Sequence, residues 1–226
     1  MFVPPTDLVP VRTADGSYTL DSATLGEHYH SLYGALTESR HVYIEQGLLA
    51  TGKRKLDILE VGLGTGLNAL LTWSESDRLG INVNYWALEP FPLPAGLHEH
   101  LHHTAVIGAP ERQEGYTAMM NMRNGGAVEL SALFHFHRER REVQHLDANE
   151  AFDLVYFDAF APAVQPDMWT VDVFRRVYRA MRPEALMVTY CAKGDVRRAM
   201  IEAGLRAERV PGPPGKYRML KAIRPR

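Results

Sequence analysis

The strongest chemical signal in the sequence is a cluster of glycines directly after an acidic residue. The segment reads Glu60-Val61-Gly62-Leu63-Gly64-Thr65-Gly66. Glycines let the backbone turn tightly and approach a ligand with no Cβ in the way. In an open α/β sheet, ligands bind beside such a loop, at the carboxyl ends of the strands. A structural turn and a nicotinamide dinucleotide site are the alternatives, but the third glycine comes one position too early for the dinucleotide pattern G-x-G-x-x-G.

Two more carboxylates follow apolar runs farther along the chain. Glu89 comes after residues 82–88, and Asp158 comes after residues 152–157. At the carboxyl end of a parallel strand, Glu89 would face the ligand crevice, where it could bind both hydroxyls of a ribose. Asp158 could accept a hydrogen bond from a substrate amine, orient it and help to remove its proton. The alternatives are a surface acid for Glu89 and a turn-forming residue for Asp158. Aromatic residues and prolines beside Asp158 favour a pocket.

The elements that would position these residues alternate between strand and helix. Short apolar runs predict buried strands over residues 56–61, 82–88, 152–157 and 186–192. Helices are predicted from residue 67, around the stripe of Phe174, Val177, Tyr178 and Met181, and over residues 195–204. Residues 205–210 and 216–223 are strand-like and flank a loop of prolines and glycines. This alternation predicts a largely parallel sheet with helices on both faces.

The two remaining regions are less regular. Residues 1–52 are rich in tyrosine and histidine and are predicted to form a hairpin and a helix. Asp15-Gly16 supplies the turn signal of that hairpin. We expect this extension to pack against a main domain of residues 53–226. The segment 94–150 shows no clear periodicity, and only loosely placed helices are predicted there.

Charge is divided unevenly along the chain. From Arg175 onwards there are 14 Lys and Arg against four acidic residues, whereas the first 174 residues carry 11 basic and 23 acidic groups. A basic end hints at a polyanionic partner, although solvated helix faces give the same count. No apolar run reaches the ~20 residues that span a membrane, and no leader sequence is visible at the start. The expected location is the cytoplasm.

Histidine and cysteine suggest no further catalytic centre. His98, His100, His102 and His103 crowd together, as do His135 and His137. A metal site is conceivable, but surface or packing histidines are favoured, and no metal is predicted. The single cysteine, Cys191, excludes a disulfide framework, fits a reducing compartment and is expected to be a small buried hydrophobe.

Several stretches together resemble one family, the MnmD type of tRNA methyltransferase, which is equivalent to the methyltransferase half of the bifunctional MnmC enzyme. The resemblance covers most of the chain, and the stretch from Asp158 to Trp169 is its most specific part. The stretches are Ala14-Asp15-Gly16, Glu27-His28-Tyr29-His30-Ser31, Gly34-Ala35, Glu38-Ser39-Arg40, the glycine segment through Leu67-Asn68, Glu89-Pro90-Phe91-Pro92-Leu93, Tyr156-Phe157-Asp158-Ala159-Phe160-Ala161-Pro162, Gln165-Pro166-Asp167-Met168-Trp169, Thr189-Tyr190-Cys191-Ala192-Lys193-Gly194 and Pro211-Gly212-Pro213-Pro214-Gly215-Lys216.

The resemblance implies a Rossmann-like class I methyltransferase with a mostly parallel, seven-stranded sheet. It implies methyl transfer from S-adenosylmethionine to the exocyclic amine of 5-aminomethyl-2-thiouridine at the tRNA wobble position, with Asp158 as the catalytic residue. It also implies that the oxidoreductase half of MnmC is absent. The residues expected to bind the methyl donor are Glu60, Gly62, Gly64, Thr65, Gly66, Asn68, Glu89 and Glu142. The residues expected to bind tRNA are Tyr29, Lys193, Lys216 and Arg218.

One departure concerns the contact with the donor's adenine. The family usually carries a Gly-Asp pair before the strand that ends at Asp158, whereas this chain reads Arg138-Glu139-Arg140-Arg141-Glu142-Val143. Glu142 is the preferred counterpart and Asp147 is the alternative. Tyr190 and Trp169 join Tyr29 as aromatic residues that could stack on a base, although core packing is the common role of such rings.

Two other functions fit the same sheet. A nicotinamide-dependent oxidoreductase is disfavoured by the glycine spacing, and a methyltransferase acting on another amine stays open. A regulatory module that binds the donor without catalysis is disfavoured because Glu60, Glu89 and Asp158 are all present together with the aromatic loop.

Overall fold

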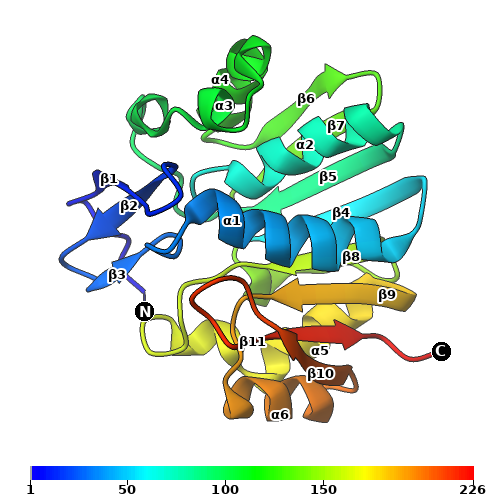
Figure 1. Ribbon diagram of the computed structural model, residues 1–226. Coiled ribbons are helices and arrows are strands. Elements are labelled where there is room, and N and C mark those ends of the chain that lie inside the picture. Colours follow the sequence, from blue (N-terminus) through cyan, green and yellow to red (C-terminus); the bar gives the residue numbers. More distant parts are fainter. Residues whose placement is uncertain (1) are drawn as a thin grey trace.

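The fold is built on one large sheet, seen in a computed structural model that describes residues 2–226 (Figure 1). The strand order is β10-β11-β9-β8-β4-β5-β7-β6. The strands are β4 (Lys55–Val61), β5 (Asn82–Leu88), β6 (Gly126–Ser131), β7 (Phe134–Glu139), β8 (Phe152–Phe157), β9 (Met181–Thr189), β10 (Arg206–Pro211) and β11 (Arg218–Ile223). The five central strands pair in parallel, and both edges are antiparallel. This confirms the α/β Rossmann-like fold.

The sheet has eight strands rather than the expected seven, because the segment 94–150 contributes β6 and β7. β7 alternates buried phenylalanines, Phe134 and Phe136, with the half-buried His135 and His137. Such period-two alternation is a strand signal. The prediction of helices alone for this segment missed it. Before these strands, the segment does form helices, α3 (His103–Val106) and α4 (Gln113–Asn121).

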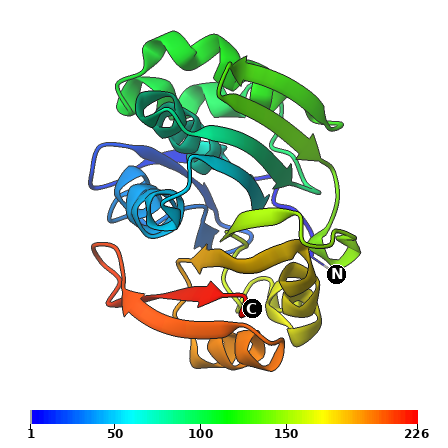
Figure 2. The same ribbon diagram turned by 90° about the vertical axis from the view of Figure 1, so that its right-hand side faces the viewer.

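Helices cover both faces of the large sheet. On one face lie α1 (Ala35–Ser39), its π-helical continuation Arg40–Leu48 and α2 (Leu67–Leu79); on the other lie α5 (Val171–Ala180) and α6 (Gly194–Glu202) (Figures 1 and 2). Successive residues of a strand point to opposite faces. Ile58 therefore belongs to the core under α1 and α2, and Leu59 to the core under α5 and α6.

The N-terminal residues form a small sheet of their own. β1 (Val9–Arg12) and β2 (Tyr18–Ser22) pair as the predicted hairpin, with Gly16 at a φ of 84° in the turn. A short third strand, β3 (Glu27–His28), was not predicted. The helix that follows packs against β8 and β9 of the large sheet. The division of the chain at residue 52 stays a prediction.

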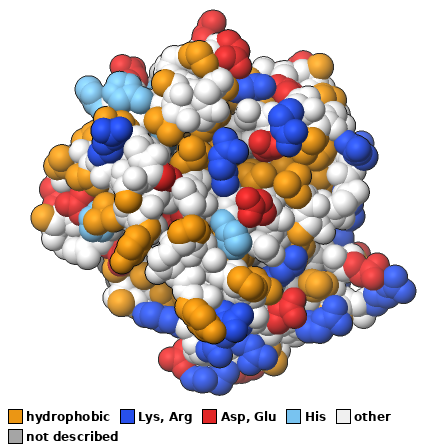
Figure 3. Space-filling view, in the orientation of Figure 1, with side chains coloured by type: hydrophobic (Ala, Val, Ile, Leu, Met, Phe, Trp, Pro, Cys, Tyr) orange, Lys and Arg blue, Asp and Glu red, His pale blue; other side chains and the backbone are white. Residues whose placement is uncertain are grey.

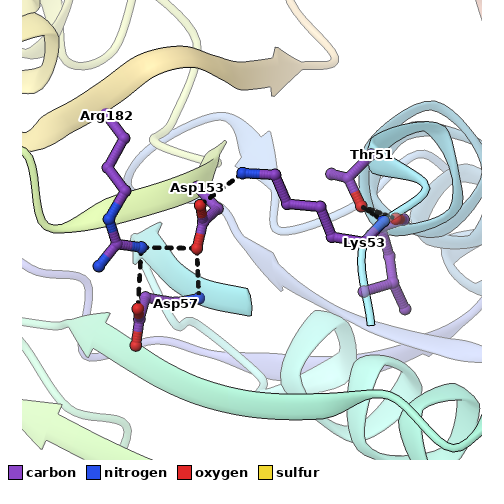
Figure 4. Close-up of polar contacts among 6 residues, drawn as sticks. Thr51, Lys53, Asp57, Asp153 and Arg182 are labelled. Carbon is purple, nitrogen blue, oxygen red and sulfur yellow. Dashed lines mark hydrogen bonds and ion pairs between the residues drawn. The ribbon is translucent and has the colours of Figure 1, made fainter. Parts of the chain in front are cut away.

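The end of the sheet opposite the carboxyl ends of β4 and β8 is held by an ion network (Figure 4). Asp153 on β8 accepts from Lys53 Nζ and Arg182 Nη1, both at 2.6 Å, and from the backbone N–H of Asp57 at 3.0 Å. Arg182 Nη1 also lies 2.8 Å from Asp57 Oδ2. Because these residues come from β4, β8, β9 and the turn before β4, the network fixes the relative position of the strands whose other ends build the site.

Candidate active site

A cleft of about 360 Å³ opens at the carboxyl ends of the parallel strands. Its walls come from the loops after β4, β5, β8 and β9, from the N-terminal sheet, from residues 141–144 and from Lys216. The segments from the large sheet are loops or strand ends, which is where open α/β sheets place their ligands. A cleft therefore lies at the edge of the sheet where the sequence predicts the site.

The glycine loop turns at the base of this cleft. Gly62 has a φ of 90°, and a Cβ there would lie 2.6 Å from the backbone oxygen of Asp158. Gly64 has a φ of 51°, and its N–H donates to Glu89 Oε2 at 3.0 Å. Gly62, Gly64 and Thr65 line the cleft, whereas Gly66 lies beneath Met119 and Met120. The loop thus joins the ends of β4, β5 and β8 into one surface.

Glu89 is buried at the end of β5 and lines the cleft. Its carboxylate accepts from the N–H groups of Gly64 and Phe91, the latter at 2.9 Å. Burial raises the pKa of Glu89, and the two backbone hydrogen bonds work against that rise. A carboxylate oriented by backbone donors and open to a cleft retains lone pairs for hydroxyl groups of a ligand.

Glu60 and Asn68 occupy the layer behind the cleft. The Asn68 amide nitrogen donates to Glu60 Oε1 at 3.0 Å and to Asp158 Oδ2 at 2.8 Å. Both residues are buried, and neither lines the cleft. Their expected direct contact with a ligand is not supported, because Asn68 on α2 and Glu60 on β4 point toward each other. Glu60 is enclosed without a cationic partner, and burial raises its pKa well above the usual value.

Asp158 is the carboxylate that faces the opening. It lies in the cleft wall after β8, and burial raises its pKa to about 6, against the lowering effect of the nearby Tyr43 hydroxyl and the Asn68 amide. Asn68 engages only Oδ2. The two oxygens of a carboxylate have about four acceptor positions, so Asp158 keeps acceptor capacity for a substrate N–H donor beside Asn68 and Tyr43.

Aromatic rings wall the cleft around Asp158. The ring of Tyr29 meets Phe160 edge-on at 4.8 Å between centroids, and both line the cleft. Trp169 is buried, and its indole N–H donates to the Phe160 carbonyl at 2.8 Å. Tyr190 Oη donates to the Ala159 carbonyl at 2.8 Å. Trp169 thus supports the loop after Asp158 from behind, while Tyr29 and Tyr190 border the open space.

Lys216 enters the cleft in an ion pair. Its Nζ lies 2.5 Å from Glu38 Oε1 and 4.1 Å from the centroid of the Tyr190 ring. Glu38 is buried on α1 and accepts from the Ser31 N–H through its second oxygen, at 2.8 Å. Glu38 belongs to one of the stretches that resemble the family, but the resemblance implies no role for it. Its partner Lys216 lies 178 positions away, so no local spacing in the sequence indicates this ion pair.

The other expected residues are spread around the cleft. Glu142 lines it, whereas Asp147 borders a separate hollow next to Trp86 and Arg182. Lys193 is exposed at the start of α6, and Arg218 lies over the Tyr217 ring at 4.7 Å. Neither Lys193 nor Arg218 lines the cleft.

Two histidines of the cluster from His98 to His103 are buried. His98 and His103 pack edge-on against Tyr116, and burial lowers the pKa of His103 to about 3. Residues 2–226 contain no group of three or more His, Cys, Asp or Glu side chains arranged to hold a metal ion. Within the same residues, no helix combines the length and apolar character needed to cross a membrane.

A family model described as S-adenosyl-L-methionine-dependent methyltransferase matches residues 113–225, half of the chain. The chain belongs to this family. The matched part includes Asp158, the aromatic loop and Lys216. S-adenosylmethionine is therefore the methyl donor, which confirms the prediction of the cofactor.

Curated relatives of this methyltransferase carry one shared description. The tRNA 5-methylaminomethyl-2-thiouridine biosynthesis bifunctional protein MnmC of Pseudomonas fluorescens is 33% identical in an alignment of 219 positions that covers 88% of this chain and 32% of the relative. The protein of the same description from Burkholderia vietnamiensis is 31% identical, over 96% of this chain and 35% of its own length. The chain spans about a third of the length of these relatives.

Solved structures show the same fold. MNMC2 from Aquifex aeolicus superposes with a TM-score of 0.74 at 22% identity, over 98% of this chain and 72% of that one. Spermidine synthase from Thermotoga maritima gives a TM-score of 0.54 at 10% identity, over 96% and 72%. Both confirm the architecture of the methyltransferase.

The polar atoms of the cleft fit the methyl donor. Thr65 Oγ1 and Gln144 Oε1 belong to cleft-lining residues, are buried and have no hydrogen-bond partner in the structure. Buried polar atoms are normally satisfied, so both call for a ligand or water. Together with Glu89 they offer acceptors and a hydroxyl on the side of the cleft that the glycine loop borders. These groups suit the amino, hydroxyl and amide-like atoms of a nucleoside with an amino-acid tail.

Proposed function

We propose that this methyltransferase methylates the exocyclic amine of 5-aminomethyl-2-thiouridine at wobble position 34 of tRNA. The observation that carries the proposal is the name shared by relatives that match 88% or more of this chain. The 5-methylaminomethyl group in that name differs from 5-aminomethyl by one methyl group on nitrogen. A methyl donor site beside a carboxylate suited to an amine supports the same step. Because the proposed substrate is tRNA, we also place the enzyme in the cytoplasm.

The donor supplies an electrophilic methyl group on its sulfonium. In this proposal Glu89 binds the ribose hydroxyls, the backbone of Gly62, Gly64 and Thr65 borders the aminoacyl end, and Glu142 contacts the adenine. Glu142 is preferred to Asp147, which borders the other hollow. Glu60, Gly66 and Asn68 contribute from the layer behind, because they do not line the cleft.

Asp158 acts on the acceptor amine. In-line attack on the methyl group requires a neutral amine with a directed lone pair. The Asp158 carboxylate accepts an N–H of the amine and so orients the lone pair of the amine toward the donor, while Asn68 holds Oδ2. With a pKa of about 6, Asp158 is ionised at neutral pH and can also help to remove the proton that the amine loses. Tyr29, Phe160 and Tyr190 border the space beside it and offer faces for the uracil ring.

Lys193 and Arg218 are proposed to hold tRNA phosphates near the cleft. Neither forms an ion pair with an acidic side chain among residues 2–226. Lys216 differs, because Glu38 already neutralises its charge. We assign Lys216 to the wall of the acceptor pocket rather than to a phosphate.

The test is incubation of the protein with labelled S-adenosylmethionine and tRNA from cells that accumulate the aminomethyl intermediate. Nucleoside analysis should show label in 5-methylaminomethyl-2-thiouridine, and none with tRNA that lacks the amine. Label in a different nucleoside would replace the proposed acceptor. Binding of NAD in preference to S-adenosylmethionine in a calorimetric titration would instead favour the oxidoreductase.

A further inference from the structure

Two tyrosines stand out of the surface beside the cleft. The side chain of Tyr33 is 68% exposed and that of Tyr217 is 86% exposed. Across residues 2–226, all other aromatic side chains are buried or half-buried. Large exposed rings forgo the favourable burial that the rest of the chain's aromatics obtain, and such positions commonly serve recognition.

Both tyrosines belong to segments that lie near the mouth of the cleft. Tyr33 lines the cleft, and Gly215 packs so closely on its ring that an added Cβ would lie 2.5 Å from Cδ2. Tyr217 follows two residues later, directly after Lys216, which enters the cleft. Figure 1 shows this loop between β10 and β11 rising toward the start of α1. Tyr33 therefore borders the opening itself, and Tyr217 lies exposed on the neighbouring loop, two residues after the glycine that contacts Tyr33.

The loop that carries Tyr217 is anchored on several sides. The Gly212 N–H donates to the Tyr217 carbonyl at 3.3 Å, and the Lys216 N–H donates to the Pro213 carbonyl at 2.9 Å. His41 Nε2 lies 3.1 Å from the Pro211 carbonyl, and Lys216 pairs with Glu38. The backbone that carries Tyr217 is therefore held in place, which lowers the entropy that the loop loses when a partner binds.

Positive charge accompanies the exposed rings. The Arg218 guanidinium lies 4.7 Å from the centroid of Tyr217, and it has no acidic partner among the described residues. In Figure 3, apolar and basic side chains lie next to one another over the lower part of this face, where Figure 1 places the β10–β11 hairpin. Aromatic faces combined with unpaired cations are the chemistry that binds single-stranded nucleic acid.

We propose that Tyr33, Tyr217 and Arg218 form a stacking platform for the unpaired nucleotides next to the reacting base. The proposal rests on the proposed function, and it names the residues that recognise the RNA outside the cleft. A base that enters a catalytic pocket leaves its neighbours unstacked. Exposed rings at the mouth replace that lost stacking, while Arg218 lies within reach of the adjoining phosphate. The platform reads the open structure of a loop rather than a duplex.

The experiment uses an anticodon stem-loop RNA with the aminomethyl uridine, and with 2-aminopurine at the position on either side of it. Stacking on a tyrosine changes 2-aminopurine fluorescence, and the titration also gives the affinity. We expect Tyr33→Ala and Tyr217→Ala each to weaken RNA binding by roughly 10-fold, in line with the loss of one stacked base. The fluorescence change next to the affected ring should disappear, with S-adenosylmethionine affinity kept.

Two further variants sharpen the test. Tyr33→Phe and Tyr217→Phe keep the ring and should bind RNA as the wild type does; a loss as large as that of the alanine variants would overturn stacking as the cause. Ile201→Ala removes another exposed apolar side chain, on α6, and should change nothing.

The outcomes separate the platform from the proposed function. Wild-type RNA affinity in both alanine variants, with normal methylation by the unmodified protein, overturns the platform alone. A wild-type protein that neither binds nor methylates the stem-loop overturns the proposed function together with the platform.

Discussion

The side-chain amide of Asn68 holds Asp158 from behind, with 2.8 Å between Nδ2 and Oδ2. The same nitrogen donates to Glu60 Oε1 at 3.0 Å. One amide in the first turn of α2 thus connects Glu60, one residue before the end of β4, with the carboxylate that faces the cleft. We therefore propose that Asn68 is a positioning residue, which acts on the substrate only through Asp158.

Replacing Asn68 by leucine keeps most of its volume and removes both hydrogen bonds. Because hydrogen bonds to charged groups contribute about 1.5–3 kcal/mol, we expect turnover to fall by roughly 10- to 100-fold. The Asn68 amide lowers the pKa of Asp158, so its loss should also move the acidic limb of the pH–rate profile to higher pH. Thr72→Val, one turn further along α2, is the matched control and should leave the profile in place. An unshifted acidic limb in Asn68→Leu would reduce this residue to a packing role.

Asp158 determines how methylation depends on pH. Its raised pKa of about 6 means that the carboxylate becomes protonated as the pH falls through 6, and a protonated Oδ1 no longer accepts the N–H of the amine. We expect the rate to drop below about pH 6. Asp158→Asn should lose this limb and lower turnover by roughly 100-fold or more, a typical range for a positioned acid–base group. Donor affinity, measured by calorimetry, should stay nearly unchanged. A variant with wild-type turnover would leave Asp158 as a loop residue.

The cations near the cleft should differ in their response to salt. Each phosphate contact releases condensed counterions, so removing one flattens the dependence of log affinity on log salt by roughly one unit. We expect this for Lys193→Ala and Arg218→Ala, which remove unpaired cations. Lys216→Ala should leave the slope unchanged and lower turnover, because it uncouples Glu38 and Tyr190 in the pocket wall. Filter binding of tRNA from low to moderate salt measures all three. A flattened slope in Lys216→Ala would return that residue to the phosphate contacts.

Asp153 should control stability without touching the chemistry. Asp153→Asn removes the charge that Lys53 and Arg182 share, and we expect a loss of about 1–2 kcal/mol in the free energy of unfolding, since both cations are partly exposed and solvent screens them. The pKa of Asp153 is lowered in the folded protein by its hydrogen bonds and the two cations. Its contribution is therefore complete above the usual aspartate pKa and is lost as the pH falls through the lowered value. Urea denaturation at several pH values tests this. Equal stability of variant and wild type at neutral pH would contradict it, and donor affinity serves as the control.

Local sequence patterns are enough to predict the central sheet and the edge of it at which the ligand-binding residues gather. Glu89 and Asp158 follow runs of apolar residues that can only be buried strands, and parallel strands bring their carboxyl ends to one edge. The glycine segment belongs to the same edge, since its positive φ angles and its contact with the Asp158 backbone require glycine. These features depend on local pattern and on one rule of topology.

Which side chains share the cleft depends on long-range packing, which local patterns do not reveal. Glu60 and Asn68 sit in the most recognisable motif, yet they point into the layer behind it, because the direction of a side chain depends on the packing of α2 against β4. The partnership of Glu38 and Lys216 joins residues 178 positions apart, and no local spacing encodes such a pair. The same holds for Tyr33 and Gly215, whose contact exists only because the β10–β11 loop folds back toward the start of α1. Long-range packing assigns these roles, since the energies that select them arise between segments that meet only in the folded chain.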